Sequence, residues 1–349
     1  MAVTHLTGGQ WSLSVSSYGG GMTTTSQIIL AHTPTGPVGR KNFGERVLTL
    51  PPLADGEFLV AVRWLSIDPT IRGWMAYDTY LPKIVEGDVI RSLGAGEVIE
   101  TRNDKYPVGT RVTGMTGWQT HVIMSGGFRV PDGVEYEQAL SVFGMTGLTA
   151  FVGIEDIGRP QAGETVVVSG AAGAVGSIAG QLAKAKGCRV IGIAGSDEKC
   201  DWVTQTLGFD DCINYKTADM SRALREECPD GIDVYFDNVG GEILNTVLGQ
   251  INDHARIVLC GAIAGYDSST LLPGPANLVN AIPRRATLQG FIVLDHYDRA
   301  GAAVAAMGPL LAEGKLTSQV HVLDGLNSAP VALADLFTGA NTGKTLVRL

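Results

Sequence analysis

Three small residues at a fixed spacing, Ala171, Gly173 and Gly176, follow the apolar run 166–168 and precede the helix-forming run 177–186. This order of strand, tight turn and helix N-terminus is typical of pyrophosphate-binding sites. Small residues let the backbone approach the phosphates, and the free N–H groups of the first helical turn bind their charge. The same pattern also occurs in an ordinary helix-capping loop, so the residues that follow must decide between the two.

The next strand, expected at 189–194, closes a β-α-β unit around this turn. In proteins that bind NAD, an acidic residue near the end of this strand bonds the ribose 2′-hydroxyl. Here the strand runs into Ser196, and Lys199 follows one turn into the next helix. A hydroxyl and a positive charge suit a 2′-phosphate, which predicts NADPH rather than NADH. Asp197 and Glu198 leave an alternative open, in which one of them faces a ribose hydroxyl and Lys199 is a solvated helix lysine.

An alternating pattern of strands and helices must position these residues. Strands at 165–169, 189–194, 212–214, 232–237, 256–260 and 287–293 alternate with helices at 175–186, 199–207, 220–228, 242–248 and 277–282, and a helix at 297–313 follows. We therefore predict an α/β fold with a doubly wound parallel Rossmann sheet. Between Ser26 and Val130, short strands separated by Gly, Pro and Asn predict a β-rich barrel or sandwich. The tail, with strands at 321–323 and 344–348, is expected to return to it.

We accordingly expect an extension or tag at 1–21, a β-rich domain formed by 22–145 and 315–349, and a Rossmann domain at 146–314. The extension lacks the features of a secretory signal, and Met22 is the expected natural start. A net charge of −9 argues against nucleic acid or anionic membranes as partners, and no apolar run approaches a membrane span. Five cysteines without C-x-x-C spacing predict reduced thiols in a cytoplasmic protein.

Longer phrases carry a family resemblance. They are LSIDPTIRG (65–73), GMTGLTA (144–150), GIAGSDEK (192–199), NYK (214–216), FDNVG (236–240), CGAI (260–263), GFIV (290–293) and NTGK (341–344). Together they resemble the zinc-independent branch of the medium-chain dehydrogenase/reductase superfamily, which contains prostaglandin reductase and related NADPH-dependent double-bond reductases. The resemblance covers Ser26 to Leu349 and implies a GroES-like β-rich domain beside the Rossmann domain. Thr70 and Thr146 depart from the family phrases, which puts the substrate preference in doubt.

The ligand positions of zinc dehydrogenases can be checked directly. Those enzymes place a Cys where this chain has Asp68, and a His-Glu pair in the loop that here reads RSLGAG (91–96). The six histidines are scattered, and the sequence has no four-cysteine cluster. Because zinc needs nitrogen or sulfur ligands close together, we predict no metal site.

Conjugate reduction of an enone or enal fits such a site better than reduction of a carbonyl group. Hydride from NADPH would add to the β-carbon, and hydrogen-bond donors would stabilise the resulting enolate oxygen. Tyr266 is the candidate donor or proton source, because it follows the strand end at 260–263, at the carboxyl edge of the sheet. The resembling family often has a tyrosine here too. The alternative is a tyrosine that only packs on the substrate or a lid.

The resemblance implies further contacts. Lys199 and Tyr215 would bind the 2′-phosphate, and Asn341 would reach the cofactor from the tail. For Asn238 and Asn341 the alternative is a turn residue that bonds its own backbone, and for Cys260 a small apolar residue. The predicted cofactor set is Met145, Thr149, Ala171, Gly173, Ala174, Val175, Gly176, Ser196, Lys199, Tyr215, Asn238, Cys260, Gly261, Ala262, Ile263, Phe291, Ile292, Val293 and Asn341. The predicted substrate pocket is Arg72, Trp74, Tyr77 and Tyr80, against the alternative of ordinary packing.

These observations predict an NADPH-dependent reductase of the C=C bond of α,β-unsaturated aldehydes and ketones. One alternative is an NADPH quinone oxidoreductase of the same superfamily, and another is a non-catalytic NADPH-binding protein. The strand at 287–293 is expected at the edge of the sheet, which predicts a homodimer paired across that edge.

Overall fold

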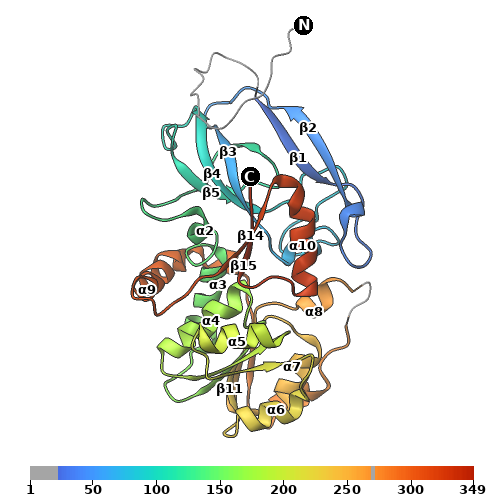
Figure 1. The fold of residues 1–349 in the computed structure, drawn as a ribbon, viewed down its shortest axis with the longest axis vertical. Helices are drawn as coiled ribbons and strands as arrows, with labels where there is room; N and C mark the ends of the chain where they lie inside the picture. Colours follow the sequence, from blue (N-terminus) through green and yellow to red (C-terminus); the bar gives the residue numbers. More distant parts are fainter. Residues whose placement is uncertain (1–22, 269–271) are drawn as a thin grey trace, which may run out of the picture.

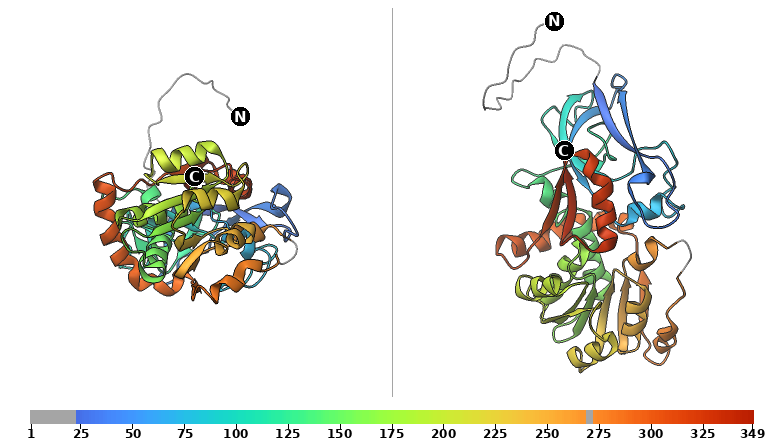
Figure 2. Two further views of the ribbon diagram at one scale, coloured as in Figure 1. Left: turned by 90° about the horizontal axis from the view of Figure 1, so that it is seen from below. Right: turned by 45° about the vertical axis from the view of Figure 1, so that its right-hand side comes forward.

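The computed structural model describes residues 23–268 and 272–349, so the extension expected at 1–21 and the start at Met22 lie outside the described residues. The chain forms a β-rich part and an α/β part, stacked along the long axis in Figure 1. Figure 2 shows the same two parts from other sides.

The α/β part is built on a six-stranded sheet in the order β10-β9-β8-β11-β12-β13. Every neighbouring pair is parallel, which confirms the predicted Rossmann sheet. The strand order reverses between β8 and β11, so the switch point of the sheet lies beside the glycine turn. The strands are β8 (Thr165–Ser169), β9 (Arg189–Ala194), β10 (Asp211–Asn214), β11 (Ile232–Asp237), β12 (Ile251–Leu259) and β13 (Thr287–Gly290).

Helices cover both faces of this sheet, because its central strands are apolar on both sides. In β8, Val166 and Val168 belong to one buried cluster, with side chains of α3, α4, α5 and α9, whereas Val167 belongs to another, with side chains of α6 and α7. None of the helices in the described part of the chain is long and apolar enough to cross a membrane. The helices are α3 (Met145–Val152), α4 (Ala174–Ala185), α5 (Asp197–Gln205), α6 (Met220–Glu227), α7 (Gly241–Leu248), α8 (Ile263–Tyr266) and α9 (Ala300–Ala312).

The β-rich part contains a seven-stranded sheet with the path β14-β15-β3-β4-β5-β7, in which β6 also pairs with β3, and a separate pair β1-β2. The tail strand β15 pairs antiparallel with β3, so the tail contributes to the seven-stranded sheet. The strands are β1 (Thr24–Leu30), β2 (Phe43–Thr49), β3 (Phe58–Ser66), β4 (Leu93–Thr101), β5 (Arg111–Met115), β6 (His121–Met124), β7 (Phe128–Arg129), β14 (Val320–Asp324) and β15 (Lys344–Arg348). The helices are α1 (Thr70–Trp74), α2 (Tyr136–Ala139) and α10 (Ala329–Thr338).

The strand expected at 256–260 begins earlier, at Ile251, and three further predicted elements differ from the structure. The strand expected at 287–293 ends at Gly290, because its pairing with β12 ends where Gly290 meets Leu259. The helix expected at 277–282 is a 3₁₀ turn, η3 (Ala276–Ala281). The helix expected at 297–313 begins at Ala300, after the kinked 3₁₀ segment η4 (Val293–Arg299). All three lie late in the α/β part, where apolar spacing alone does not separate a tight turn from a helix.

Candidate functional site

The glycine turn begins where β8 ends. Gly170 has a φ of +60°, and Gly173 is the N-cap of the twelve-residue helix α4. A Cβ at Gly176 would lie 2.3 Å from the Gly170 carbonyl oxygen, so a larger residue does not fit there. Ala171 is fully buried. The turn therefore places Ala174 and Val175 at the N-terminus of α4, where backbone N–H groups have no partner within the helix. Such an arrangement suits a pyrophosphate.

The end of β9 leads into the N-terminus of α5. The Ser196 Oγ accepts a hydrogen bond from the Lys199 backbone N–H at 3.3 Å and so caps the helix. Asp197 is one of the two alternative partners for a ribose, beside Glu198, and its Oδ1 accepts a hydrogen bond from Asn214 Nδ2 at 2.7 Å. This carboxylate is thus engaged with the neighbouring strand β10.

Lys199 and Lys216 lie close enough together for their charges to interact, and Tyr215 lies beside Lys216. The Lys199 Nζ lies against Gly339 at the end of α10, and both Tyr215 and Lys216 lie against Gly195. Burial lowers the pKa of Lys199, and the charge of Lys216 lowers it further. Within residues 23–268 and 272–349, neither ammonium group has an ion pair or a side-chain hydrogen bond. Two unpaired cations beside a phenol suit a phosphate group, and Lys216 is a member that sequence reasoning missed, although it stands in the NYK phrase.

A buried carboxylate organises the switch point. Asp237 is 1% exposed, and its Oδ1 accepts hydrogen bonds from the backbone N–H groups of Val239 and Gly240, at 3.0 and 2.9 Å, and from the Ser169 hydroxyl at 3.1 Å. Asn238 Nδ2 donates to the Ser169 carbonyl oxygen at 2.7 Å, so it ties β11 to β8 rather than bonding its own turn. Sequence reasoning did not single out Asp237 as a site residue, because a buried carboxylate at a strand end has no spacing signature.

The segments predicted to line the nicotinamide follow β12 and β13. The backbone N–H groups of Cys260 and Gly261 donate to the Asp237 carbonyl oxygen, at 2.9 and 3.0 Å. Burial raises the pKa of the Cys260 thiol to about 12, so this residue behaves as a small apolar group. Phe291–Val293 lies directly beyond the carboxyl end of β13, at the same edge of the sheet.

Met145 and Thr149 are placed by α3. Met145 is the first residue of that helix and follows the N-cap Gly144, and the Thr149 hydroxyl donates to the Met145 carbonyl oxygen at 2.7 Å. Both side chains are partly exposed. They lie one helical turn apart on one side of α3, as a shared contact with a cofactor requires.

Tyr266 ends the short helix α8, which packs against α1 of the β-rich part. Its hydroxyl oxygen accepts a hydrogen bond from the Ala262 backbone N–H at 3.3 Å. Burial raises the pKa of Tyr266, so the phenol keeps its proton at neutral pH. A protonated phenol whose oxygen already accepts one N–H has its own O–H free to donate.

Arg72 supports the chain next to Tyr266. Its guanidinium is 3% exposed, lies 3.2 Å from Asp267, and donates to the carbonyl oxygens of Gly36 and Pro34 at 2.9 and 3.3 Å. The sequence places Arg72 among the pocket residues, which stays a prediction, and its contacts suit a positioning role. They fix Asp267, and with it the end of α8, to the β-rich part.

The predicted pocket aromatics divide into buried and exposed side chains. Trp74 is 8% exposed and packs in the core of the β-rich part, whereas Tyr77 and Tyr80 are 51% and 43% exposed. Tyr80 meets Trp74 edge-on, with ring centroids 6.2 Å apart. Burial raises the pKa of the Tyr80 phenol, which Tyr266 and Asp68 raise a little more. Tyr77 and Tyr80 are thus the two predicted pocket aromatics with the most exposed side chains.

A largely buried ion pair joins Lys344 of the tail strand β15 to Asp68. Lys344 is 2% exposed, and its Nζ donates to Asp68 Oδ1 at 2.6 Å and to the Ile67 carbonyl oxygen at 2.7 Å. The second carboxylate oxygen of Asp68 accepts a hydrogen bond from the Ser66 hydroxyl at 2.5 Å. Burial lowers the pKa of Lys344, and the Asp68 carboxylate opposes that shift. Sequence reasoning missed this pair.

The tail also contacts the glycine turn. The Gly343 backbone N–H donates to the Ala172 carbonyl oxygen at 2.8 Å. Asn341 Nδ2 donates to the Gly343 carbonyl oxygen at 3.2 Å, so its amide satisfies its own turn, as the alternative interpretation holds. Asn341 nevertheless lies two residues from the contact with the turn, and its carboxamide oxygen can still accept a hydrogen bond.

Known proteins share this architecture. Family profiles described as "N-terminal domain of oxidoreductase" and "Zinc-binding dehydrogenase" match residues 26–130 and 174–307. The NADPH-dependent curcumin reductase of Escherichia coli (strain K12) is 37% identical over 330 residues, which cover 92% of this chain and 96% of that protein. Prostaglandin reductase 1 of Bos taurus is 40% identical over 316 residues, which cover 88% and 94%. This chain belongs to the medium-chain dehydrogenase/reductase family.

A solved member of the family superposes closely. The crystal structure of CurA in complex with NADPH from Vibrio vulnificus matches with a TM-score of 0.89 and 40% identity, covering 93% of this chain and 98% of that chain. One family profile carries a zinc-binding description. In the part of this reductase that the structure describes, no group of three His, Cys, Asp or Glu side chains is placed to hold a metal ion.

Proposed function

We propose that this protein reduces the C=C bond of α,β-unsaturated aldehydes and ketones with NADPH. The observation that carries the proposal is the partly buried Tyr266 hydroxyl beyond the carboxyl end of β12. Its oxygen accepts a hydrogen bond from the Ala262 N–H, and burial raises its pKa, so that it keeps its proton at neutral pH. The names of the curcumin and prostaglandin reductases, which are 37% and 40% identical, support the same reaction class.

The residues present fit NADPH. The glycine turn and the N-terminus of α4 would hold the pyrophosphate, and Lys199, Tyr215 and Lys216 would hold the 2′-phosphate. Asn238, the 260–263 segment and 291–293 would line the nicotinamide half. When bound, NADPH supplies the hydride that adds to the β-carbon of the substrate.

The chain itself contributes orientation and charge stabilisation. The Tyr266 hydroxyl would donate a hydrogen bond to the carbonyl oxygen, where negative charge develops in the transition state. Arg72 and Asp267 would keep α8 in position for that contact. The α-carbon is then protonated by Tyr266 or by water.

One assay tests this function against its alternatives. NADPH consumption is followed with a 2-alkenal, an enone, a quinone and a saturated ketone, each with a blank that lacks protein. We expect turnover of the first two substrates. Turnover of the quinone alone would favour a quinone oxidoreductase, and NADPH binding without any turnover would favour a non-catalytic protein.

We also propose a homodimer paired along β13, the edge strand of the Rossmann sheet. Exposed apolar side chains in and directly after the neighbouring 3₁₀ segment η3 support this, since Leu278, Val279 and Ile282 are 48%, 63% and 77% exposed. Light scattering should give twice the mass of the chain. A monomer at assay concentration would remove the dimer but not the reductase.

A further inference from the structure

Two cysteines of the α/β part lie in contact with each other. Cys200, in α5, and Cys212, in β10, have Sγ atoms 2.7 Å apart, although they stand 12 positions apart in the chain. A disulfide bond is about 2.05 Å long, so the two sulfurs would need to approach by less than an ångström to form one. The structure holds all five cysteines of the chain as free thiols, so this pair is reduced here.

Close packing of α5 on the sheet brings the two thiols together. Gly192 of β9 is the register partner of Cys212, and a Cβ at this glycine would lie 3.2 Å from the Cys212 sulfur. The same Cβ would lie 3.0 Å from Ala171 and from Val203 of α5. The missing side chain thus gives α5 room to approach the strands and to place Cys200 against Cys212. Ala171 belongs to the glycine turn, so the thiol pair lies close to the proposed pyrophosphate site.

The two thiols differ in acidity. A hydrogen bond from Cys212 lowers the pKa of the Cys200 thiol, and the same bond raises the pKa of Cys212. Cys200 is therefore the better nucleophile, because the thiolate is the form that attacks an oxidant, and Cys212 is a neutral thiol beside it. Both side chains are partly exposed. Burial instead raises the pKa of the other three thiols, Cys188, Cys228 and Cys260, which makes them less reactive.

The pair also lies between the groups proposed to hold the 2′-phosphate. Lys199 directly precedes Cys200 in the first turn of α5. Tyr215 and Lys216 follow Cys212 directly beyond the end of β10. Drawing the sulfurs to bonding distance would shift α5 relative to β10, and with it the Lys199 ammonium relative to the Lys216 ammonium.

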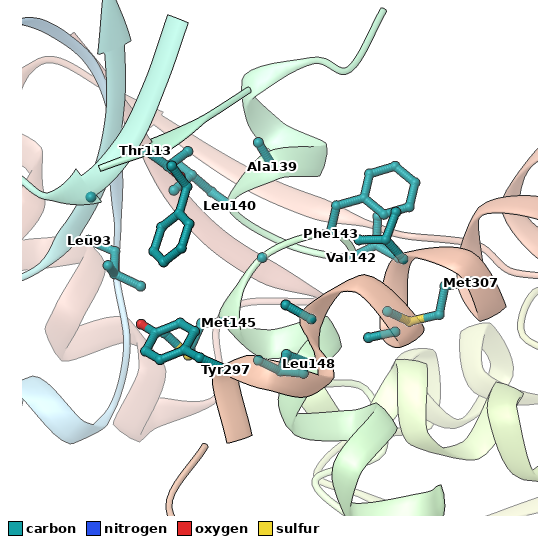
Figure 3. A pocket seen from close by; sticks show the side chains of 16 residues that line it. Leu93, Thr113, Ala139, Leu140, Val142, Phe143, Met145, Leu148, Tyr297 and Met307 are labelled. Carbon is teal, nitrogen blue, oxygen red and sulfur yellow. The ribbon is translucent and has the colours of Figure 1, made fainter. Parts of the chain in front are cut away.

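The apolar cavity between α2, α3 and α9 lies elsewhere (Figure 3). None of the described residues that line it belongs to α5 or β10. A change at the thiol pair should therefore act on the phosphate end of the cofactor site and leave this cavity as it is.

We propose that Cys200 and Cys212 are a modification site, at which hydrogen peroxide or an organic hydroperoxide produces a disulfide bond that weakens NADPH binding. The effect on NADPH rests on the 2′-phosphate site proposed above, whereas disulfide formation does not depend on it.

The reaction has two steps. The Cys200 thiolate attacks one peroxide oxygen, so that an S–O bond forms, the O–O bond breaks, and the leaving hydroxide takes up a proton as water. The Cys212 sulfur then attacks the Cys200 sulfenic acid, the S–S bond forms, and the hydroxide that leaves takes the Cys212 proton as a second water. Both thiols are oxidised and the peroxide is reduced, without any further reactant.

Tryptic digestion tests the disulfide directly. Trypsin cleaves after Lys199 and Lys216, and the segment 200–216 has no other Lys or Arg, so one peptide contains both cysteines. The full chain is treated with hydrogen peroxide, its remaining thiols are alkylated in denaturant, and the peptide is weighed. We expect a peptide without alkyl groups that is lighter than its reduced form by two hydrogen atoms, and dithiothreitol should reverse the change. A peptide alkylated at both cysteines, or one with a sulfinic acid at Cys200, would overturn the site.

Fluorescence titration of the reduced and the oxidised protein tests the effect on the cofactor. Because a displaced ammonium loses part of a charge-assisted hydrogen bond, oxidation should raise the Kd of NADPH about threefold or more and leave the Kd of NADH within about twofold. Cys200→Ser, which lacks the attacking thiol, should keep its Kd after peroxide treatment. Cys188→Ser retains the pair and should respond like wild type. Equal Kd values of NADPH for reduced and oxidised wild type would overturn the effect on the cofactor.

The same measurements separate this proposal from the proposed function. A protein that forms the disulfide but reduces no enone would remove the reductase function and leave the modification site in place. A reduced protein that binds NADPH and NADH equally well would remove the 2′-phosphate site, and with it the effect of oxidation on NADPH binding.

Discussion

The two ends of the proposed NADPH site are built in different ways. The phosphate end uses residues 170–216 of a single β-α-β-α-β run, on the adjacent strands β8, β9 and β10. The carbonyl end brings together Tyr266 of α8, Arg72 of α1, and Lys344 and Asp68, which are separated by 276 residues. The first end is fixed by local geometry, and the second depends on how the β-rich and Rossmann parts pack on each other.

The two ends also differ in whether their positively charged side chains are already paired. At the phosphate end the cations Lys199 and Lys216 have no partner among the described residues, so their charge is available to a ligand. At the carbonyl end the cations Arg72 and Lys344 are already paired with Asp267 and Asp68. The phosphate end is thus arranged for binding an anion, and the carbonyl end for holding a neutral donor, Tyr266, in one place.

The largest expected effect is at Tyr266. Tyr266→Phe should lower kcat by on the order of a hundredfold, because loss of one oxyanion donor has that size of effect, while KM for NADPH changes little. Steady-state kinetics with an enone measures both quantities. Tyr106→Phe is the matched control, since its hydroxyl bonds Gly127 in the β-rich part. An unchanged kcat with a raised KM for the enone would leave Tyr266 as a packing residue.

At the phosphate end the expected effect is on binding rather than on chemistry. Lys199→Ala should raise KM for NADPH by roughly ten- to a hundredfold, the range for a lost charge-assisted hydrogen bond, and leave KM for NADH nearly unchanged. Lys216→Ala should also raise KM for NADPH. Lys186→Ala serves as the control, because the wild-type Lys186 pairs with Glu155. Equal changes for the two cofactors would remove the 2′-phosphate role.

The positioning role of Arg72 predicts a smaller effect. Lysine cannot reproduce the fork that reaches Asp267, Gly36 and Pro34, so Arg72→Lys should lower kcat by about tenfold through a looser α8. If Arg72 acts by positioning the Tyr266 hydroxyl, kcat of the double variant Arg72→Lys/Tyr266→Phe should be no lower than kcat of Tyr266→Phe alone. Fully additive losses would mean that Arg72 acts on the substrate itself, as a pocket residue.

The same contrast explains how much the sequence could predict. The glycine turn, Ser196, Lys199 and the strand order follow from short-range spacing, because a β-α-β unit fixes its own geometry. The pairing of Arg72 with Asp267, and of Lys344 with Asp68, joins residues whose proximity depends on the packing of the two parts. Asp237 and Lys216 lie in sequence segments that carry the family resemblance. Only the folded chain brings four donors to Asp237, two backbone N–H groups and the hydroxyls of Ser169 and Tyr235, and leaves the Lys216 ammonium unpaired among the described residues.

The smallest expected effect is a pH dependence confined to the phosphate end. Burial and the neighbouring Lys216 lower the pKa of Lys199, so its ammonium loses its proton at a pH below the ordinary lysine value of about 10.4. KM for NADPH should therefore rise as the pH increases toward that value, whereas KM for NADH stays flat. Lys199→Arg should abolish the rise, because a guanidinium keeps its charge throughout. The raised pKa of Tyr266 predicts that kcat does not fall over the same range, and a parallel decline of kcat would place the titrating group at the carbonyl end instead.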